Sequence, residues 1–280
     1  MASQGKRVLY INLSREKFET RTLPELDKYI GGVGLGLKLG MLYREEDPVI
    51  FSVGPLNGFF PFASKTSVVL FSEDGVEDIY LGGSLSHRIK FFGVDAIVFA
   101  GRAKKPRFLN IAGDAVAFNH SLSEVNNLGL PGKKSSLAFS NNELVLDGYF
   151  KTRDFLLEEK FKEKNIDGFV LTADKLYEVK EFDKYEEIYK RLLARAKELT
   201  VEKSNCPSCV GCPMGCEKSR VGEIGGNVLI HSLVACTFAH GIYCDASTVF
   251  SCLNVLGYDY THEDIENLPV LISEVLKELS

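Results

Sequence analysis

The chain has 280 residues, a formal net charge of −5 and seven cysteines. A chain of this length buries roughly three quarters of its unfolded surface, so it needs neither disulfides nor a metal to fold. Acidic and basic residues are interspersed, and the absence of a basic stripe excludes nucleic acid as a partner. An odd number of cysteines, all within residues 206–252, favours reduced thiols in the cytoplasm over a disulfide framework.

The first part of the chain, up to about Tyr177, alternates short β-branched or aromatic runs with Gly, Asn and Pro turns, a pattern typical of strands. Apolar residues at helical spacing predict a helix over Leu26–Tyr43 and a shorter one over Ser84–Phe92. The predicted strands are Val8–Leu13, Val49–Val53, Ser67–Phe71, Ala96–Ala100, Phe108–Ile111, Glu143–Leu146 and Gly168–Leu171.

From Phe182 onward the apolar period becomes helical. After a first charged helix that ends near Ala196, the predicted helices are Val228–His240, Ala246–Leu256 with Asp245 as N-cap, and His262–Leu279 with Thr261 as N-cap. The sequence therefore predicts an α+β protein. A β-rich mixed domain over residues 1–180 precedes a helical domain over residues 181–280.

An uncharged stretch, Ile224–Cys244, is about as long as a membrane span. Its glycines, Asn227, His231 and His240 would be costly in lipid, so we interpret it as a buried helix and expect no membrane partner. Both histidines are expected to be buried and structural.

Four cysteines fall in one short segment, with two residues between each of the first three and three before the last. This spacing is that of a ferredoxin-type loop that holds a [4Fe-4S] cluster through its thiolates. The small residues Ser208, Gly211 and Gly215 would let the backbone turn tightly around the metal. The predicted ligands are Cys206, Cys209, Cys212 and Cys216.

Two alternatives stay open for this loop. A structural zinc site is the first, although zinc is more often held by two separated ligand pairs. The second concerns the fourth cluster ligand, for which Cys206 is the first choice and Cys252 the alternative, followed by Cys244 and Cys236. Each of these later cysteines could equally be a small buried apolar residue on a helix.

Three further segments contain residues that could bind a ligand. Residues 31–36 are rich in glycine, but they follow a helical start and lack the spacing of a dinucleotide turn, so close packing against another element is expected instead. Residues 78–84 form a strand-to-helix turn that is either an ordinary helix start or an anion site. Lys65 is a lone cation between hydroxyl residues, and no residue pattern assigns a catalytic acid, base or nucleophile.

The order of these segments resembles the aldehyde ferredoxin oxidoreductase family of tungsten enzymes. The similarity covers most of the chain and is carried by several motifs together. They are Val8-Leu-Tyr-Ile-Asn-Leu-Ser14, Tyr29-Ile-Gly-Gly-Val-Gly-Leu35, Phe51-Ser-Val-Gly-Pro-Leu-Asn-Gly58, Ser64-Lys-Thr-Ser-Val-Val69, Gly82-Gly83 with Lys90-Phe-Phe-Gly-Val-Asp-Ala96, the triplet Cys209, Cys212 and Cys216, His240-Gly-Ile242, and Cys252-Leu-Asn-Val-Leu-Gly-Tyr-Asp259.

The resemblance implies a β-rich base for tungstopterin and a nearby [4Fe-4S] cluster that passes electrons to ferredoxin. It also implies that the chain is a shortened homologue, because the family's C-terminal part is missing. That missing part carries further pterin contacts and the usual fourth cysteine, which Cys206 could replace. The residues matching the pterin-like site are Lys65, Ser67, Gly82 and Gly83.

The chain departs from the family mainly at pterin-contact positions. Lys65 replaces an arginine, Tyr80 an asparagine, Glu158–Lys164 a glycine-rich segment, and Leu229 and His231 two glutamates. We therefore expect an iron–sulfur electron-transfer protein that works beside ferredoxin or a catalytic oxidoreductase subunit. Tungstopterin-dependent oxidation of aldehydes to acids and a zinc-stapled interaction module are the alternatives.

Overall fold

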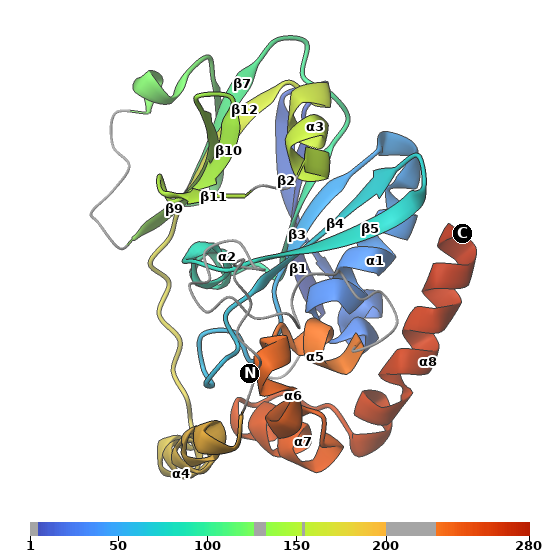
Figure 1. Cartoon of the computed structure of the whole chain (residues 1–280), viewed down its shortest axis with the longest axis vertical. Coiled ribbons are helices and arrows are strands. Elements are labelled where there is room, and N and C mark those ends of the chain that lie inside the picture. Colours follow the sequence, from blue (N-terminus) through green and yellow to red (C-terminus); the bar gives the residue numbers. More distant parts are fainter. Residues whose placement is uncertain (1–4, 126–132, 153–154, 200–227) are drawn as a thin grey trace.

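The computed structural model describes residues 5–125, 133–152, 155–199 and 228–280. Its centre is a six-stranded mixed sheet, called the first sheet (Figure 1), in which β1 and β6 are parallel and the other neighbours antiparallel. In spatial order its strands are β2 (Lys17–Leu23), β1 (Lys6–Asn12), β6 (Ala96–Ala100), β3 (Val49–Ser52), β4 (Thr66–Ser72) and β5 (Gly75–Leu81).

A second six-stranded sheet packs on one face of the first. Its parallel pair is β12 with β7, and its other neighbours are antiparallel. In spatial order its strands are β11 (Phe150–Lys151), β10 (Glu143–Leu146), β9 (Lys134–Ser140), β12 (Ile166–Thr172), β7 (Arg107–Ala112) and β8 (Ala115–Asn119).

The first sheet is the middle layer, because both of its faces are buried. Along β1, Leu9 and Ile11 face the second sheet, whereas Val8 and Tyr10 face the helices. A strand with two buried faces reads as a continuous apolar run, since successive side chains point to opposite sides. Edge-to-face rings join the two sheets, with Phe51 and Phe169 5.3 Å apart between ring centroids.

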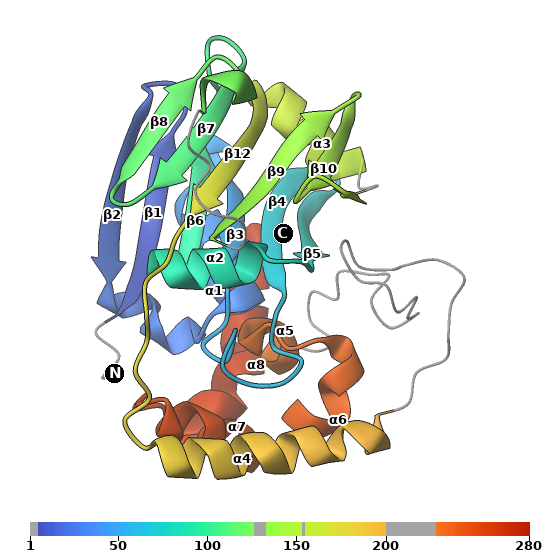
Figure 2. The ribbon, with the colours of Figure 1, turned by 90° about the vertical axis from the view of Figure 1, so that its left-hand side faces the viewer.

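On the other face of the first sheet α1 packs against β3 and β4, and α5 and α8 pack against α1 (Figures 1 and 2). The helices α2 and α3 pack against the second sheet instead. Asp245 and Thr261 cap α7 and α8 as predicted, each accepting a backbone N–H bond. The helices are α1 (Gly32–Leu42), α2 (Leu85–Phe92), α3 (Phe155–Glu163), α4 (Phe182–Ala194), α5 (Val228–Leu233), α6 (His240–Tyr243), α7 (Ala246–Val255) and α8 (His262–Leu279). Short 3-10 segments are η1 (Pro24–Tyr29), η2 (Arg44–Glu46), η3 (Leu122–Glu124), η4 (Arg195–Glu198) and η6 (Thr237–Ala239).

The α+β class is confirmed by the two mixed sheets and their helices. The boundary near residue 180 stays a prediction, and the larger hydrophobic cluster draws residues from both sides of it, among them Tyr10 and Leu253. No helix of the described residues is long and apolar enough to cross a membrane.

Two predicted helices were too long. Leu26–Tyr43 is a 3-10 segment and then α1, because Ile30 adopts a φ of 59° between them. Val228–His240 breaks at Val234, where φ is 53° and the chain leaves α5 to pair with another segment. The expectation that both histidines are buried was right for His231 but wrong for His240, which is exposed on α6.

The helix α3 and the strands β2, β5, β8, β9 and β11 are not predicted by the sequence pattern. The α3 helix contains most of the charged segment that departs from the family pattern. Its buried residues Leu157 and Phe161 pack in the core between the sheets, which explains why a charged sequence forms a helix there. The carboxylate of Glu158 accepts hydrogen bonds from the backbone N–H of Leu144, at 3.1 Å, and from the hydroxyl of Thr152.

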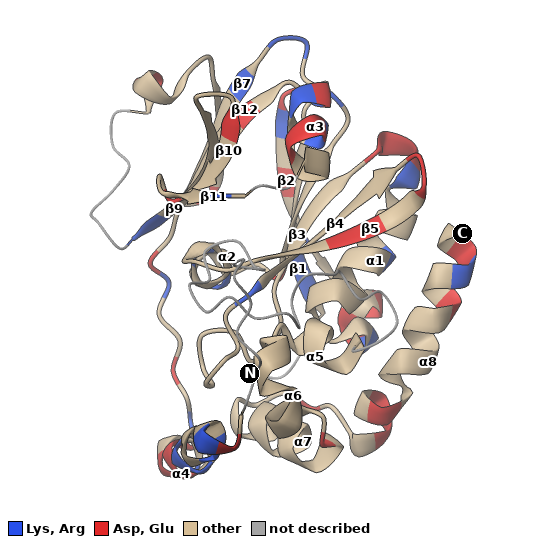
Figure 3. Cartoon of the chain, viewed as in Figure 1, with Lys and Arg blue, Asp and Glu red and all other residues tan. Residues whose placement is uncertain are grey.

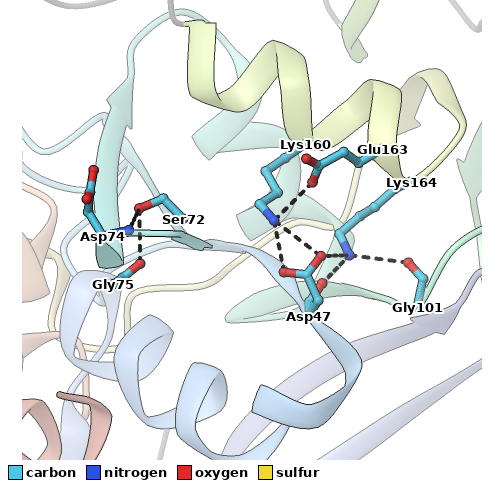
Figure 4. A network of polar contacts seen from close by, with 8 residues as sticks. All are labelled: Asp47, Ser72, Asp74, Gly75, Gly101, Lys160, Glu163 and Lys164. Atoms are coloured by element: carbon cyan, nitrogen blue, oxygen red, sulfur yellow. Dashed lines mark hydrogen bonds and ion pairs between the residues drawn. The ribbon is translucent and has the colours of Figure 1, made fainter.

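Lysines at the end of α3 hold the start of β3 (Figure 4). The ammonium groups of Lys160 and Lys164 each lie 3.2 Å from the carboxylate of Asp47, and Lys164 also donates to the carbonyl of Gly101 at 3.2 Å. Lys160 forms a further ion pair with Glu163 at 3.0 Å. The lysines of this segment therefore connect α3 to the first sheet.

Candidate functional site

The predicted ligand-binding residues Lys65 and Ser67 lie where the first sheet meets the helices. Lys65 comes directly before β4, and Ser67 lies within it. Because the two residues are two positions apart, their side chains lie on the same face of the extended strand. Val69, the next residue on that face, packs in the helical cluster. Ser67 pairs in register with Tyr80 of β5, so the tyrosine shares this face.

The uncharged helix α5 lies near the end of the first sheet at which β4 begins (Figure 3). A methyl group placed on Gly32 would lie 2.1 Å from the carbonyl oxygen of His231, and one on Gly54 would lie 2.1 Å from that of Leu233. The glycines therefore permit close packing of two backbones, as the sequence analysis expected for residues 31–36.

Beyond α5 the backbone pairs with the loop before β4. The N–H of Cys236 donates to the carbonyl of Phe62 at 2.6 Å, and the N–H of Lys65 donates to that of Val234 at 3.4 Å. These bonds satisfy the backbone groups released where the helix ends. They also fix Lys65 beside the helical segment.

Two aromatic rings lie in contact where α5 meets the edge of the first sheet. The rings of Tyr80 and His231 lie 4.3 Å apart between centroids and tilt by 32°. Both residues are expected departures from the family that the sequence resembles, and His231 is buried. The departures therefore meet in space, although 151 positions separate them in the sequence.

Two buried donors remain at this corner. Lys65 is 7% exposed and Ser67 fully buried, and within the described part of the chain neither the Nζ of Lys65 nor the Oγ of Ser67 has a hydrogen-bond partner. Buried polar groups normally have partners, so this pair suits an acceptor such as an anionic group.

The turn at Gly82 and Gly83 differs, because its donors are already used. The carboxylate of Asp147 accepts bonds from the N–H of Ser84 at 3.2 Å and from its hydroxyl at 2.9 Å. The other oxygen of Asp147 accepts from Ser135 at 2.6 Å. The chain's own carboxylate thus fills the anion position of this turn. Lys65 and Ser67 therefore suit an anionic group better than the turn at Gly82 and Gly83 does, and the role of all four residues stays a prediction.

The four loop cysteines, from Cys206 to Cys216, lie outside the described residues. Of the later cysteines, Cys252 is buried in the helical cluster, Cys236 is partly exposed and Cys244 is exposed. Burial raises the pKa of Cys252 to about 12. Among the described residues no three His, Cys, Asp or Glu side chains are grouped as metal ligands.

Asp147 is the residue that sequence reasoning missed at this site. It lies with φ of 54° in a turn before Gly148, and an Asp-Gly pair predicts a turn but not a contact 63 positions away. The lysines of α3 were noted only as a departure, since helical spacing did not reveal their shared partner Asp47.

Comparison with known proteins gives three findings. The family model for the N-terminal domain of aldehyde ferredoxin oxidoreductase matches residues 8–163. The chain is 34% identical over 131 residues to the aliphatic sulfonate oxidoreductase, WOR-like subunit, of Pyrococcus furiosus, an alignment covering 41% of this chain and 21% of that protein.

The fold is similar to a chain in the solved active site complex BamBC of benzoyl coenzyme A reductase with 1,5 dienoyl-CoA. The TM-score is 0.58 at 18% identity, and the match covers 69% of this chain and 34% of that one. At this identity the similarity concerns the fold alone. The chain therefore spans about a fifth of the length of the Pyrococcus furiosus protein and about a third of the length of the chain in the BamBC complex.

Proposed function

Because this chain belongs to the aldehyde ferredoxin oxidoreductase family, matched over residues 8–163, we propose that it is an iron–sulfur component of a larger oxidoreductase. Its task is single-electron transfer to or from ferredoxin or a catalytic subunit. The [4Fe-4S] cluster that would carry the electron is held by Cys206, Cys209, Cys212 and Cys216.

The observation that carries this proposal is the cysteine spacing together with its anchored flanks. Leu192 of α4, before the cysteine segment, is 1% exposed, and Val228 of α5, after it, is 5% exposed. Both belong to the same hydrophobic cluster. A ligand loop whose two ends are fixed in one core loses less conformational freedom when it binds a metal.

Cys206 is the proposed fourth ligand in preference to Cys252. A cluster needs thiolates, and Cys252 is fully buried among apolar side chains that disfavour its thiolate. Cys206 stands three residues from Cys209, in the local spacing of the ferredoxin loop.

A role as a component is supported by the relatives. The Pyrococcus furiosus relative is a subunit of an aliphatic sulfonate oxidoreductase, and the chain spans about a fifth of its length.

Tungstopterin-dependent oxidation of an aldehyde is the second candidate, favoured by the buried Nζ of Lys65 and Oγ of Ser67. When bound, such a cofactor would supply the oxo-transfer chemistry. Lys65 and Ser67 would hold an anionic part of it by hydrogen bonds. The turn at Gly83 is less suited, because Asp147 would repel a phosphate there.

Metal analysis of protein purified without oxygen from its own host tests both candidates. We expect iron and acid-labile sulfide in equal amounts, and an electron paramagnetic resonance signal after reduction. Cys212→Ser should lose both, whereas Cys244→Ser, on an exposed residue, should retain them. Zinc without sulfide would overturn the iron–sulfur proposal in favour of a zinc-stapled module, and tungsten with pterin would establish the second candidate.

A further inference from the structure

The strand β2 forms an open edge of the first sheet. It is the terminal strand in the sheet order, and among the described strands it pairs only with β1. Figure 2 shows it at the outer boundary of the molecule. Six of its seven residues are exposed, and its register with β1 is unbroken from Lys17 to Leu23. A regular open edge is a template for another strand.

The sequence of β2, Lys-Phe-Glu-Thr-Arg-Thr-Leu, is complementary to itself when it runs antiparallel. With Thr20 at the centre, Glu19 of one copy stands opposite Arg21 of the other, and Arg21 opposite Glu19. Phe18 stands opposite Thr22 on the alternate face. Opposite charges, Thr–Thr pairs and aromatic–β-branched pairs are all favourable across antiparallel strands.

We propose that two copies of this chain associate through their β2 edges, in antiparallel register about Thr20. The two first sheets become one continuous sheet across a two-fold axis. Such a contact is isologous, because the same patch serves both copies, and it closes after two chains. The partner is a second copy because the charge pattern matches its own reverse.

The single chain already shows the components of this contact. Arg21 forms an ion pair with Glu19 of its own strand, and the two side chains are 44% and 48% exposed. They lie on one face at alternate positions, so each can also reach the opposite strand. Phe18 is 38% exposed, an apolar ring that pairing would cover.

Two features that interrupt strand addition are absent from β2. It has no internal proline or bulge, and Pro24 comes only after the strand ends. Lys17 is the one charge without an opposite partner in the proposed register, since Leu23 faces it. Lys17 therefore provides a matched control on the same strand.

The test is sedimentation of the full chain across the micromolar range. We expect a species of twice the 31.1 kDa chain mass. Either single variant, Glu19→Arg or Arg21→Glu, places two residues of the same charge opposite each other at both symmetric positions of the dimer. Each variant should therefore raise the dissociation constant of the dimer at least about tenfold. Lys17→Glu should leave it unchanged.

Two further experiments test whether the effect comes from the pairing of opposite charges across the interface. The double variant Glu19→Arg with Arg21→Glu restores opposite charges and should dimerise again. An equimolar mixture of the two single variants should form a mixed dimer. Circular dichroism of each variant checks that the fold is intact. A wild-type chain that stays monomeric, or single reversals that leave the dimer unaffected, would overturn the proposal, whatever metal the cysteine loop holds.

Discussion

The ring of His231 lies 4.3 Å from the ring of Tyr80, and the two together join α5 to β5. His231 is buried and Tyr80 is half-buried, so the two rings fill space on the face of the sheet that carries Ser67.

A double-mutant cycle should measure this contact. Combining Tyr80→Ala with His231→Ala should give a coupling free energy of about 0.5–1.5 kcal/mol, the usual range for paired aromatic rings. The measurement is urea unfolding of the wild type, both single variants and the double variant. Tyr80→Ala combined with Phe118→Ala, on β8 of the second sheet, should be additive. Additivity in the first pair would contradict the contact.

Gly54→Ala should destabilise the protein by about 3 kcal/mol or more. The added methyl would lie 2.1 Å from the carbonyl oxygen of Leu233, a backbone atom that cannot turn aside as a side chain does. Gly241→Ala is the matched control, because its methyl would meet only Leu199 at 3.8 Å, inside helix α6. That variant should be neutral or more stable by about 0.5–1 kcal/mol. Equal unfolding midpoints for the two variants would refute this account.

The sequence was most informative where one physical signal dominates. Apolar runs with two buried faces revealed β1, β3, β4 and β6, and cap residues located α7 and α8. The strands that were missed lack such a signal. β2 has three charged residues and is exposed at six of its seven positions, so its pairing with β1 and not its own pattern makes it a strand.

The candidate site was less predictable, because its contacts are long-range. The helical spacing of apolar residues predicted that this helix would continue to His240. In the structure α5 ends at Leu233, and the backbone N–H of Cys236 bonds to the carbonyl of Phe62 instead. The pattern around residues 78–84 left two interpretations open, an ordinary helix start and an anion site. Only the fold shows that the carboxylate of Asp147 accepts the hydrogen bonds of Ser84 at this turn.

Cys252 should resist alkylation in the folded protein. Burial raises the pKa of its thiol to about 12, so at pH 8 only about one molecule in ten thousand carries the reactive thiolate. Iodoacetamide at pH 8, followed by peptide mass spectrometry, should modify the exposed Cys244 and spare Cys252. Urea should make the two react alike. Rapid native labelling of Cys252 would show that the helical cluster opens.

Lys164 has its ammonium group in the interior, and its side chain is only 2% exposed. Burial lowers its pKa below the ordinary 10.5, and the Coulomb attraction of Asp47 opposes that shift without cancelling it. Lys160, beside it, has a raised pKa, because its hydrogen bonds to Glu163 and Asp47 outweigh the effect of burial. Two neighbouring lysines therefore make opposite contributions to the pH dependence of stability.

Replacing each lysine with methionine should separate these contributions. Between the lowered pKa of Lys164 and 10.5, the unfolded chain binds more protons than the folded one, so stability from this residue rises with pH. The difference in unfolding free energy between the wild type and Lys164→Met should therefore grow in favour of the wild type as pH approaches 10.5. For Lys160→Met the difference should stay level below 10.5, because a raised pKa contributes fully there and is lost only above it. Urea unfolding from pH 8 upward measures both, and parallel curves for the two variants would show that the Lys164 ammonium is not desolvated.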